Sequence, residues 1–165
     1  MITMRSFVHV NGIRGEDVIT FLLNCTDRLY RRWWPGTHLR LHTIKRARGN
    51  VGSLIVMDEY VGRRRLTMQG VVTELVPGRR LVLQWKQIVR LPAWLELDFA
   101  DDDRGVTVTH TVRAGLPGAG AVLDPLIRLY LSDAFARALD EHVKVEMPRL
   151  GVLLSGGRAP QPTPS

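Results

Sequence analysis

His110 is the residue in this sequence best suited to proton transfer. It lies between two threonines, in a stretch where valine occupies the alternate positions. Because successive side chains of a strand point to opposite faces, this pattern predicts that His110 points inward with the valines. An imidazole there could act as a general acid or base if burial brings its pKa near neutrality. The plainer interpretation, which we favour, is a core histidine bonded to the backbone.

The other candidate ligands do not predict a metal site. His38 and His42 lie two pleats apart on one predicted strand, about 13 Å by strand rise, which is too far for both to bind one ion. Cys25 is the single cysteine, so the 165 residues hold neither an internal disulfide nor a Cys-based zinc cage. His142 lies at the edge of the apolar arc of a predicted helix and is expected to cap the core. We therefore expect no metal and no cofactor.

The positive charge of the chain is concentrated in one region. The 23 Lys and Arg and 16 Asp and Glu give a net charge of +7. Residues 28 to 90 contain 14 basic and three acidic residues, a local charge of +11, so the remainder carries 9 − 13 = −4. Such a surface could attract nucleic acid or an anionic membrane. Arginine outnumbers lysine 20 to three, and no aromatic residue flanks the Arg63 to Arg65 run, so we favour a solvated basic face.

The elements that must position these residues follow one another in a clear order. A short strand over 5–10 precedes two helices, which begin near Gly15 and Thr26. Short turns then separate six predicted strands, which favours antiparallel neighbours. These strands are expected at 38–46, 53–60, 65–76, 80–89, 93–100 and 105–113. A long amphipathic helix should begin at Asp124 and end or kink near Met147, because Pro148 follows.

The length and the 45% hydrophobic content predict one domain with a packed core. We expect residues 1–155 to form this domain and 156–165 to form a flexible tail rich in Pro and Gly. The first ten residues lack the apolar core of a secretion signal, and no stretch approaches the roughly 18 apolar residues of a membrane span. A cytoplasmic location is therefore expected.

This order of elements resembles the helix-grip fold of the SRPBCC superfamily, which includes START domains and polyketide cyclases/dehydrases. The resemblance covers roughly residues 5–154. It rests on Gly15-Glu16-Asp17-Val18 with Phe21, Trp34-Pro35, Gly52-Ser53, Gly115-Leu116-Pro117-Gly118, and His142 through Leu150. It implies an α+β fold in which a curved antiparallel sheet of about seven strands wraps around the C-terminal helix. It also implies an internal cavity for a lipid-like, isoprenoid-like or polyketide-like ligand.

The predicted cavity residues are mostly aromatic or sulfur-containing, because such side chains suit flat apolar ligands. Each could equally be plain core. The predicted ligand-binding residues are Trp34, His38, Tyr60, Met68, Trp85, His110, Leu131, Phe135 and His142.

Three classes of function remain open at this level. The first is a carrier of a small hydrophobic molecule. The second is a cyclase, aromatase or dehydratase in which His110 and Tyr60 move protons. The third is an interaction module, for which an anionic membrane surface is the more plausible partner and nucleic acid the less plausible one. Either a monomer or a homodimer agrees with the sequence.

Overall fold

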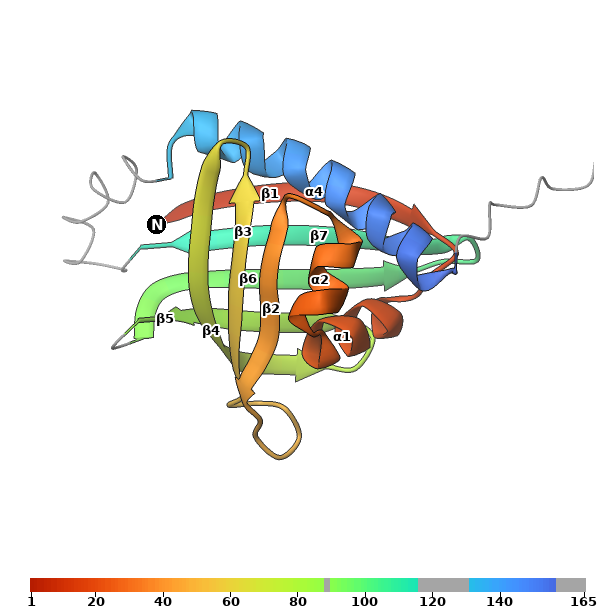
Figure 1. The fold of residues 1–165 in the computed structure, drawn as a ribbon, viewed down its shortest axis with the longest axis horizontal. Coiled ribbons are helices and arrows are strands. Elements are labelled where there is room, and N and C mark those ends of the chain that lie inside the picture. The colour runs from red at the N-terminus through yellow and green to blue at the C-terminus, as the bar shows by residue number, and fades with distance from the viewer. Residues whose placement is uncertain (88–89, 116–130, 157–165) are drawn as a thin grey trace, which may run out of the picture.

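The computed structural model describes residues 1–87, 90–115 and 131–156. Seven antiparallel strands form one sheet in the order β1-β7-β6-β5-β4-β3-β2. Figure 1 shows the sheet curling so that β2, β3 and β4 cross in front of β1, β7 and β6. The strands are β1 (Ile2–Asn11), β2 (His38–Lys45), β3 (Leu54–Val61), β4 (Arg64–Val76), β5 (Arg80–Lys86), β6 (Arg90–Asp101) and β7 (Gly105–Ala114). The predicted curved meander is therefore confirmed.

Two short helices, α1 (Gly15–Asn24) and α2 (Asp27–Trp33), connect β1 to β2. The Thr26 side chain accepts a hydrogen bond from the Leu29 backbone N–H and so caps α2. Gly15 begins α1 where the chain passes against β6 and the β4–β5 turn. A Cβ atom at this position would lie 2.2 Å from the Gly78 carbonyl oxygen, so only glycine fits.

The C-terminal helix α4 (Asp133–Leu154) packs mainly against β1 and also contacts α2 and β3. It differs from the predicted helix at both ends. Ser132 has extended backbone and its hydroxyl accepts a hydrogen bond from the Phe135 N–H, so the helix begins at Asp133. Leu131 therefore precedes the helix. Residues 124–130, where we predicted the start, lie outside the described residues.

Pro148 lies inside α4, so the prediction that it ends or kinks the helix near Met147 is wrong about the end. Proline removes one helical hydrogen bond, but side chains of the following turn are buried against the rest of the protein, and this packing stabilises the turn. Leu150 and Gly151 are buried, and a Cβ atom at Gly151 would lie 2.6 Å from the Val10 side chain of β1. The close contact with β1 favours continuation of the helix past the proline.

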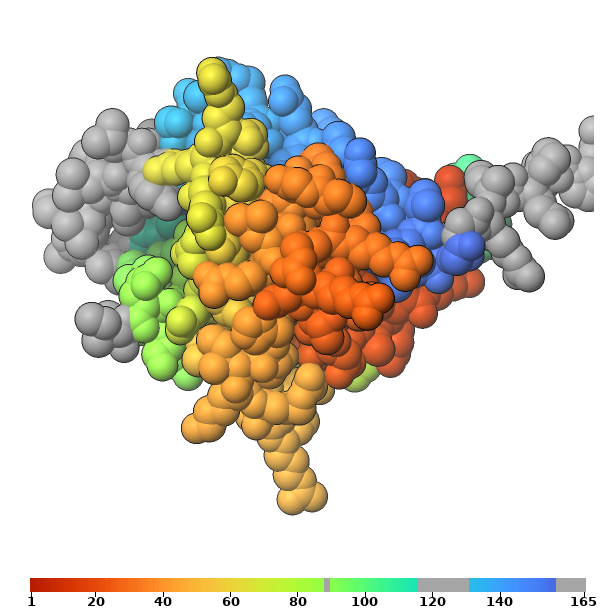
Figure 2. Space-filling model, viewed as in Figure 1, coloured from red at the N-terminus to blue at the C-terminus, as the bar shows by residue number. Residues whose placement is uncertain are grey.

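The β3–β4 hairpin reaches the beginning of α4. Gly62 makes this turn with φ of 59°, a left-handed conformation that suits glycine. Figure 2 shows the tip of the hairpin projecting from the surface beside α4. The Arg64 guanidinium lies 5.5 Å from the centre of the Phe135 ring. The hairpin tip predicted for the arginine run is thus present and touches the helix.

No described helix is both long and apolar enough to cross a membrane. Of the predicted tail, only Gly156 lies within the described residues. The division into a domain over 1–155 and a tail stays a prediction.

Candidate functional site

A cavity of about 370 Å³ lies between the sheet and the first turn of α4. β4 contributes Leu66 and Met68, β5 contributes Trp85, and the end of β7 contributes Ala114. Leu131 and Phe135 close it from the helix side. The other described lining residues are Thr67, Gln87, Leu91, Pro92 and Ala93. The lining is predominantly apolar, as in sites for small hydrophobic molecules.

Two smaller voids continue from this cavity into the core. One of about 30 Å³ shares Leu66, Met68, Trp85 and Phe135 with the large cavity. A second void, of about 50 Å³, shares lining residues with the 30 Å³ void. The shared walls of these two voids are formed by Met57, Glu59, Leu95 and His110. The three spaces thus form a row that runs from the large cavity to buried polar groups.

Those polar groups include His38, Glu59, His142 and Glu146, which we call the His–Glu cluster. All four are buried, and one ligand atom from each lies within 4.8 Å of the others. His38 Nε2 lies 3.2 Å from Glu146 Oε1 and 3.6 Å from Glu59 Oε2. His142 Nε2 lies 3.8 Å from an oxygen of each carboxyl group. The cluster brings together β2, β3 and α4.

Simple register rules explain why these residues meet. His38 pairs directly with Glu59 across the antiparallel β2–β3 ladder, so both side chains point to the same inner face. His142 and Glu146 are four residues apart on α4 and therefore share one face of the helix. The packing of α4 against α2 fixes the helix face, because Trp33 Nε1 donates a 2.8 Å hydrogen bond to the Glu146 carbonyl oxygen.

Tyr30 organises the side of the cluster that faces α2. Its ring stacks on the His38 ring, with centres 3.9 Å apart and planes within 7°. Its hydroxyl donates a hydrogen bond to Glu59 Oε2. Burial, followed by the charges of Glu59 and Glu146, raises the pKa of Tyr30 well above its usual range. Tyr30 is therefore a hydrogen-bond donor to the cluster rather than a source of negative charge.

Burial sets the charge state of the cluster. It raises the pKa of Glu59 to about 7, with repulsion from Glu146 as the next cause. It also raises the pKa of Glu146 to about 7. Burial lowers the pKa of His38 to about 4 and also lowers the pKa of His142. The imidazoles are thus neutral near pH 7, and the two carboxyl groups hold protons more tightly than exposed ones.

His110 lies next to the cluster, between the two inner voids. It is buried, as the valine alternation predicted, and its Nδ1 has no hydrogen-bond partner. Burial, followed by the influence of His142, lowers its pKa to about 4. The favoured interpretation of a core histidine agrees with this burial and with a hydrogen bond to its own backbone, which partly offsets the lowering of its pKa.

The predicted ligand-binding residues separate into three groups, with His142 in two of them. Met68, Trp85, Leu131 and Phe135 line the large cavity. His110 lines the inner voids, while His38 and His142 belong to the cluster. Trp34, Tyr60 and His142 line a separate groove of about 230 Å³ between β3 and α4. The cavity and this groove have no described lining residue in common.

The predicted inward orientation of Tyr60 is wrong. Its side chain lies on the opposite face of β3 from Met57 and Glu59, and the residue is 37% exposed. The error arises because β3 has apolar residues on both faces, so that Leu54 and Val56 gave the wrong choice of inner face. Tyr60 and His110 therefore do not line a common cavity.

The predicted site residues did not include Glu59, Glu146 and Tyr30. The useful signal for Glu59 was its position in the alternate series with Ile55, Met57 and Val61. For Glu146 it was the four-residue spacing from His142. The predicted separation of His38 and His42 excludes one ion shared by those two residues. His42 Nδ1 lies 2.7 Å from Asp27 Oδ1, away from the cluster, whereas His38 is part of it.

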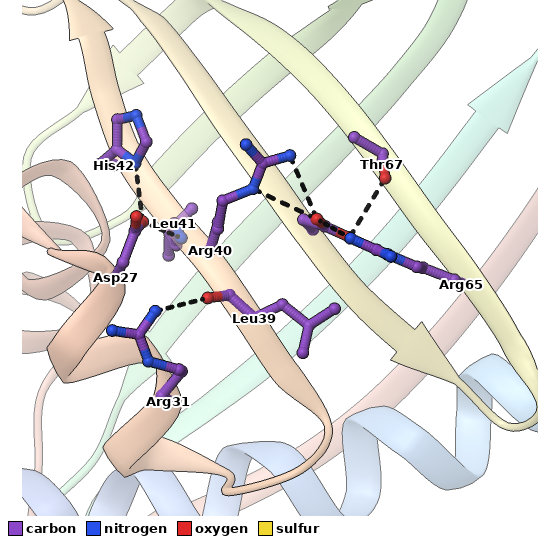
Figure 3. A network of polar contacts seen from close by, with 9 residues as sticks. Asp27, Arg31, Leu39, Arg40, Leu41, His42, Arg65 and Thr67 are labelled. Atoms are coloured by element: carbon purple, nitrogen blue, oxygen red, sulfur yellow. Dashed lines mark hydrogen bonds and ion pairs between the residues drawn. The ribbon is translucent and has the colours of Figure 1, made fainter.

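Asp58 forms a contrasting network on the outer face of the same strand. Its carboxylate accepts hydrogen bonds from Arg65 at 2.8 and 2.9 Å, from Thr67 at 3.1 Å and from Arg40 at 3.3 Å. Figure 3 shows Arg40, Arg65 and Thr67 converging from β2 and β4. The Arg65 hydrogen bonds are the main reason that the pKa of Asp58 is lowered. Part of the basic region thus neutralises this one buried carboxylate.

Solved structures with the same arrangement of elements share little sequence with this chain. The KanY protein matches with a TM-score of 0.62 and 11% identity, over 94% of this chain and 98% of its own. The Thermus thermophilus protein TTHA0849 gives 0.60 at 12% identity, over 96% and 100%. A Cytophaga hutchinsonii protein gives 0.56 at 13% identity, over 94% and 95%.

No family model and no curated protein matches the sequence. The likeness to solved structures establishes the architecture and leaves the activity to be argued from the site. The seven-stranded curved sheet and long C-terminal helix give this chain the α+β helix-grip architecture that the order of its elements predicted.

Proposed function

We propose that the protein binds a small hydrophobic ligand in the cavity between the sheet and α4. The supporting observation is the cavity of about 370 Å³, lined by Met68, Trp85, Leu131 and Phe135. Its volume lies in the range of about 300–1,000 Å³ that is usual for small-molecule sites. Transfer of apolar ligand surface from water into this lining would supply the binding free energy, at roughly 25 cal/mol per Å² buried.

The row of voids suggests that the ligand has one polar end. Beyond the apolar cavity, the inner voids are bounded by His110, Glu59 and Glu146. A hydroxyl, carbonyl or carboxylic acid at the inner end of a lipid-like, isoprenoid-like or polyketide-like molecule would find hydrogen-bonding groups there. Such a group would relieve the unpaired Nδ1 atom of His110.

A fluorescence titration tests this proposal. The probe is N-phenyl-naphthylamine, a neutral dye whose emission increases in apolar surroundings. We expect saturable binding to the wild-type protein and a loss of at least about tenfold in affinity in Ala93→Phe, which fills the cavity. The matched control, Val152→Phe, alters an exposed residue of α4 and should bind as the wild type does.

Absence of dye binding, together with absence of an adduct by native mass spectrometry after incubation with a panel of apolar lipids and aromatics, would contradict the proposal. Equal dye affinity in wild type and Ala93→Phe would place the dye elsewhere and would also count against this cavity.

A cyclase, aromatase or dehydratase is the alternative function. The observation that favours it is the neutral, buried imidazole of His110 beside the carboxyl group of Glu59 at the inner end of the voids. Tyr60 is not part of this alternative, because it lies on the other face of β3. If the protein is such an enzyme, His110→Gln should lower turnover while leaving dye affinity nearly unchanged. A parallel loss of dye affinity would indicate that His110 contributes to packing.

The proposals for partners and location follow from the ligand proposal. A cytoplasmic carrier would act as a monomer or homodimer and could collect its ligand at an anionic membrane surface. Salt-sensitive binding to anionic vesicles would support that contact.

A further inference from the structure

The His–Glu cluster has a feature that hydrophobic binding does not require. Two carboxyl groups and two imidazoles meet in a buried place, and each offers an atom suited to bind a metal. Burial of two carboxylates without compensation is unfavourable, because each loses its hydration and repels the other. Within the described part of the chain, neither Glu59 nor Glu146 forms an ion pair with a lysine or arginine. The cluster thus holds two carboxyl groups whose charge, when they are ionised, no lysine or arginine among the described residues balances.

The nitrogen-to-oxygen distances within the cluster are close to those around a tetrahedral metal ion. Zinc lies about 2.0–2.1 Å from imidazole nitrogens and about 2.0–2.2 Å from carboxylate oxygens, so ligand atoms in a tetrahedral site are about 3.4 Å apart. Both imidazole nitrogens lie 3.6 and 3.8 Å from the same Glu59 oxygen, Oε2, whereas they face different oxygens of Glu146, Oε1 at 3.2 Å and Oε2 at 3.8 Å. The four ligand atoms, one from each residue, all lie within 4.8 Å of one another, so side-chain rotations that shorten the longest separations by up to about 1.4 Å would place them on one ion.

The imidazole nitrogens supply an independent observation. His38 Nε2 and His142 Nε2 are both buried and have no hydrogen-bond partner, although carboxylate oxygens lie nearby. Buried polar nitrogens are normally satisfied, so these two call for a partner. A metal ion between the imidazoles and the carboxylates would satisfy both nitrogens together.

We propose that His38, Glu59, His142 and Glu146 bind one divalent transition-metal ion of the zinc type. Two carboxylates, two neutral imidazoles and a dication give a site with no net charge. Mixed nitrogen and oxygen ligands favour zinc and its neighbours, whereas calcium and magnesium prefer oxygen ligands in larger number.

Residues of α2 orient three of the four proposed ligands. The Tyr30 hydroxyl donates to Glu59 Oε2, and the Tyr30 ring stacks on His38. Trp33 fixes the backbone of α4 at Glu146. Such contacts orient the ligands and commonly contribute a factor of about 10–100 in metal affinity.

The cluster lies between the outer groove and the inner void. His142 lines the outer groove together with Trp34 and Tyr60, while Glu59 and Glu146 line the inner void. An ion could therefore enter through the groove and be held at the end of the ligand cavity. This arrangement gives Trp34 and Tyr60 a position at the entrance to a metal site rather than in the hydrophobic cavity.

Isothermal titration of the metal-stripped full chain with zinc chloride tests the proposal. We expect one ion per chain, and a loss of at least about tenfold in affinity in Glu146→Gln and in His142→Ala. The matched control is His42→Ala, which removes a histidine that pairs with Asp27 outside the cluster. Circular dichroism of each variant checks that the fold is retained.

Cobalt provides a second measurement that needs no variant to fold. In a tetrahedral nitrogen and oxygen site, Co²⁺ should give intense visible absorption that zinc abolishes by displacement. Absence of that absorption in the wild type, or zinc binding that is equal in wild type and Glu146→Gln, would overturn the proposal. Because the dye experiment needs no metal, its outcome separates failure of this site from failure of the hydrophobic cavity.

Discussion

Asp58 and Glu59 are neighbours on β3 that place buried carboxyl groups on opposite faces of the sheet. Asp58 points outward, where Arg40 and Arg65 donate hydrogen bonds to it. Glu59 points inward, where its neighbours are two histidines, a tyrosine hydroxyl and a second carboxyl group. As a result the pKa of Asp58 is lowered, whereas the pKa of Glu59 is raised to about 7.

The difference separates a structural network from a candidate site. The outer carboxylate has its compensating cations supplied by the chain itself, so its network stabilises the fold without any further partner. The inner carboxyl groups lack such cations among the described residues, and their burial opposes folding whenever they are ionised. Perturbed groups beside a cavity are typical of functional sites. The comparison therefore directs experiments to the inner face.

The largest expected effect is stabilisation by metal. A ligand that binds only the folded state at a free concentration about a thousandfold above its Kd adds about 4 kcal/mol to the free energy of unfolding. We expect zinc to increase the free energy of unfolding by this amount in the wild type and in Asp58→Asn, and by much less in Glu146→Gln. Urea unfolding with and without zinc measures the increase. An equal increase in all three proteins would contradict the assignment of zinc binding to the inner carboxyl groups.

The next effect is the loss of the outer network. Asp58→Asn removes the charge that two arginines bind, and we expect it to lower the free energy of unfolding by about 2 kcal/mol at pH 7. The folded pKa of Asp58 lies below its unfolded value, so this contribution is present above the unfolded pKa and is lost as pH falls through the folded pKa. The difference between wild type and variant should therefore shrink in acid, and a difference that persists unchanged in acid would contradict this explanation.

Glu59→Gln should raise the free energy of unfolding of the metal-free protein, whereas Asp58→Asn should lower it. The folded pKa of about 7 lies above the usual 4.5, so the carboxyl group costs stability progressively as pH rises from 4.5 to 7. The amide carries no charge and its oxygen can still accept from Tyr30. With EDTA at pH 8 we expect a gain of at least about 1 kcal/mol, because each unit by which the pKa is raised corresponds to about 1.4 kcal/mol, and the gain should disappear near pH 4.5. A loss at pH 8 would show that the ionised carboxylate is already compensated.

The smallest effect is expected for Arg40→Ala. Arg65 still holds Asp58 through two hydrogen bonds, and the Arg40 side chain is half exposed. The free energy of unfolding should fall by no more than about 1 kcal/mol, because exposed ion pairs contribute little. Thermal unfolding at low and high salt measures it. A larger loss would mean that both arginines are needed to neutralise Asp58.

Much of the fold could be predicted because its signals are local. The short turns at Gly62 and Pro77-Gly78 set antiparallel neighbours, and alternation along β7 placed His110 inside. Local signals failed at α4, where Ser132 rather than the expected Asp124 caps the described helix and contact with β1 accompanies the helix past Pro148. Met68, Trp85 and Phe135 could be placed near the cavity because each is a large apolar side chain on the face that alternation or helical spacing predicted to be inside.

Turn residues and side-chain periodicity act over a few neighbours, and they were sufficient to predict the order of elements, the antiparallel sheet and the burial of His110. Tertiary packing set which face of β3 is inside, and so placed Glu59 rather than Tyr60 in the interior. It also brought His38 to Glu59 by strand register and carried His142 and Glu146 to the same place on a distant helix. Such a site depends on contacts between residues about 100 positions apart, and no local pattern encodes the packing that creates them.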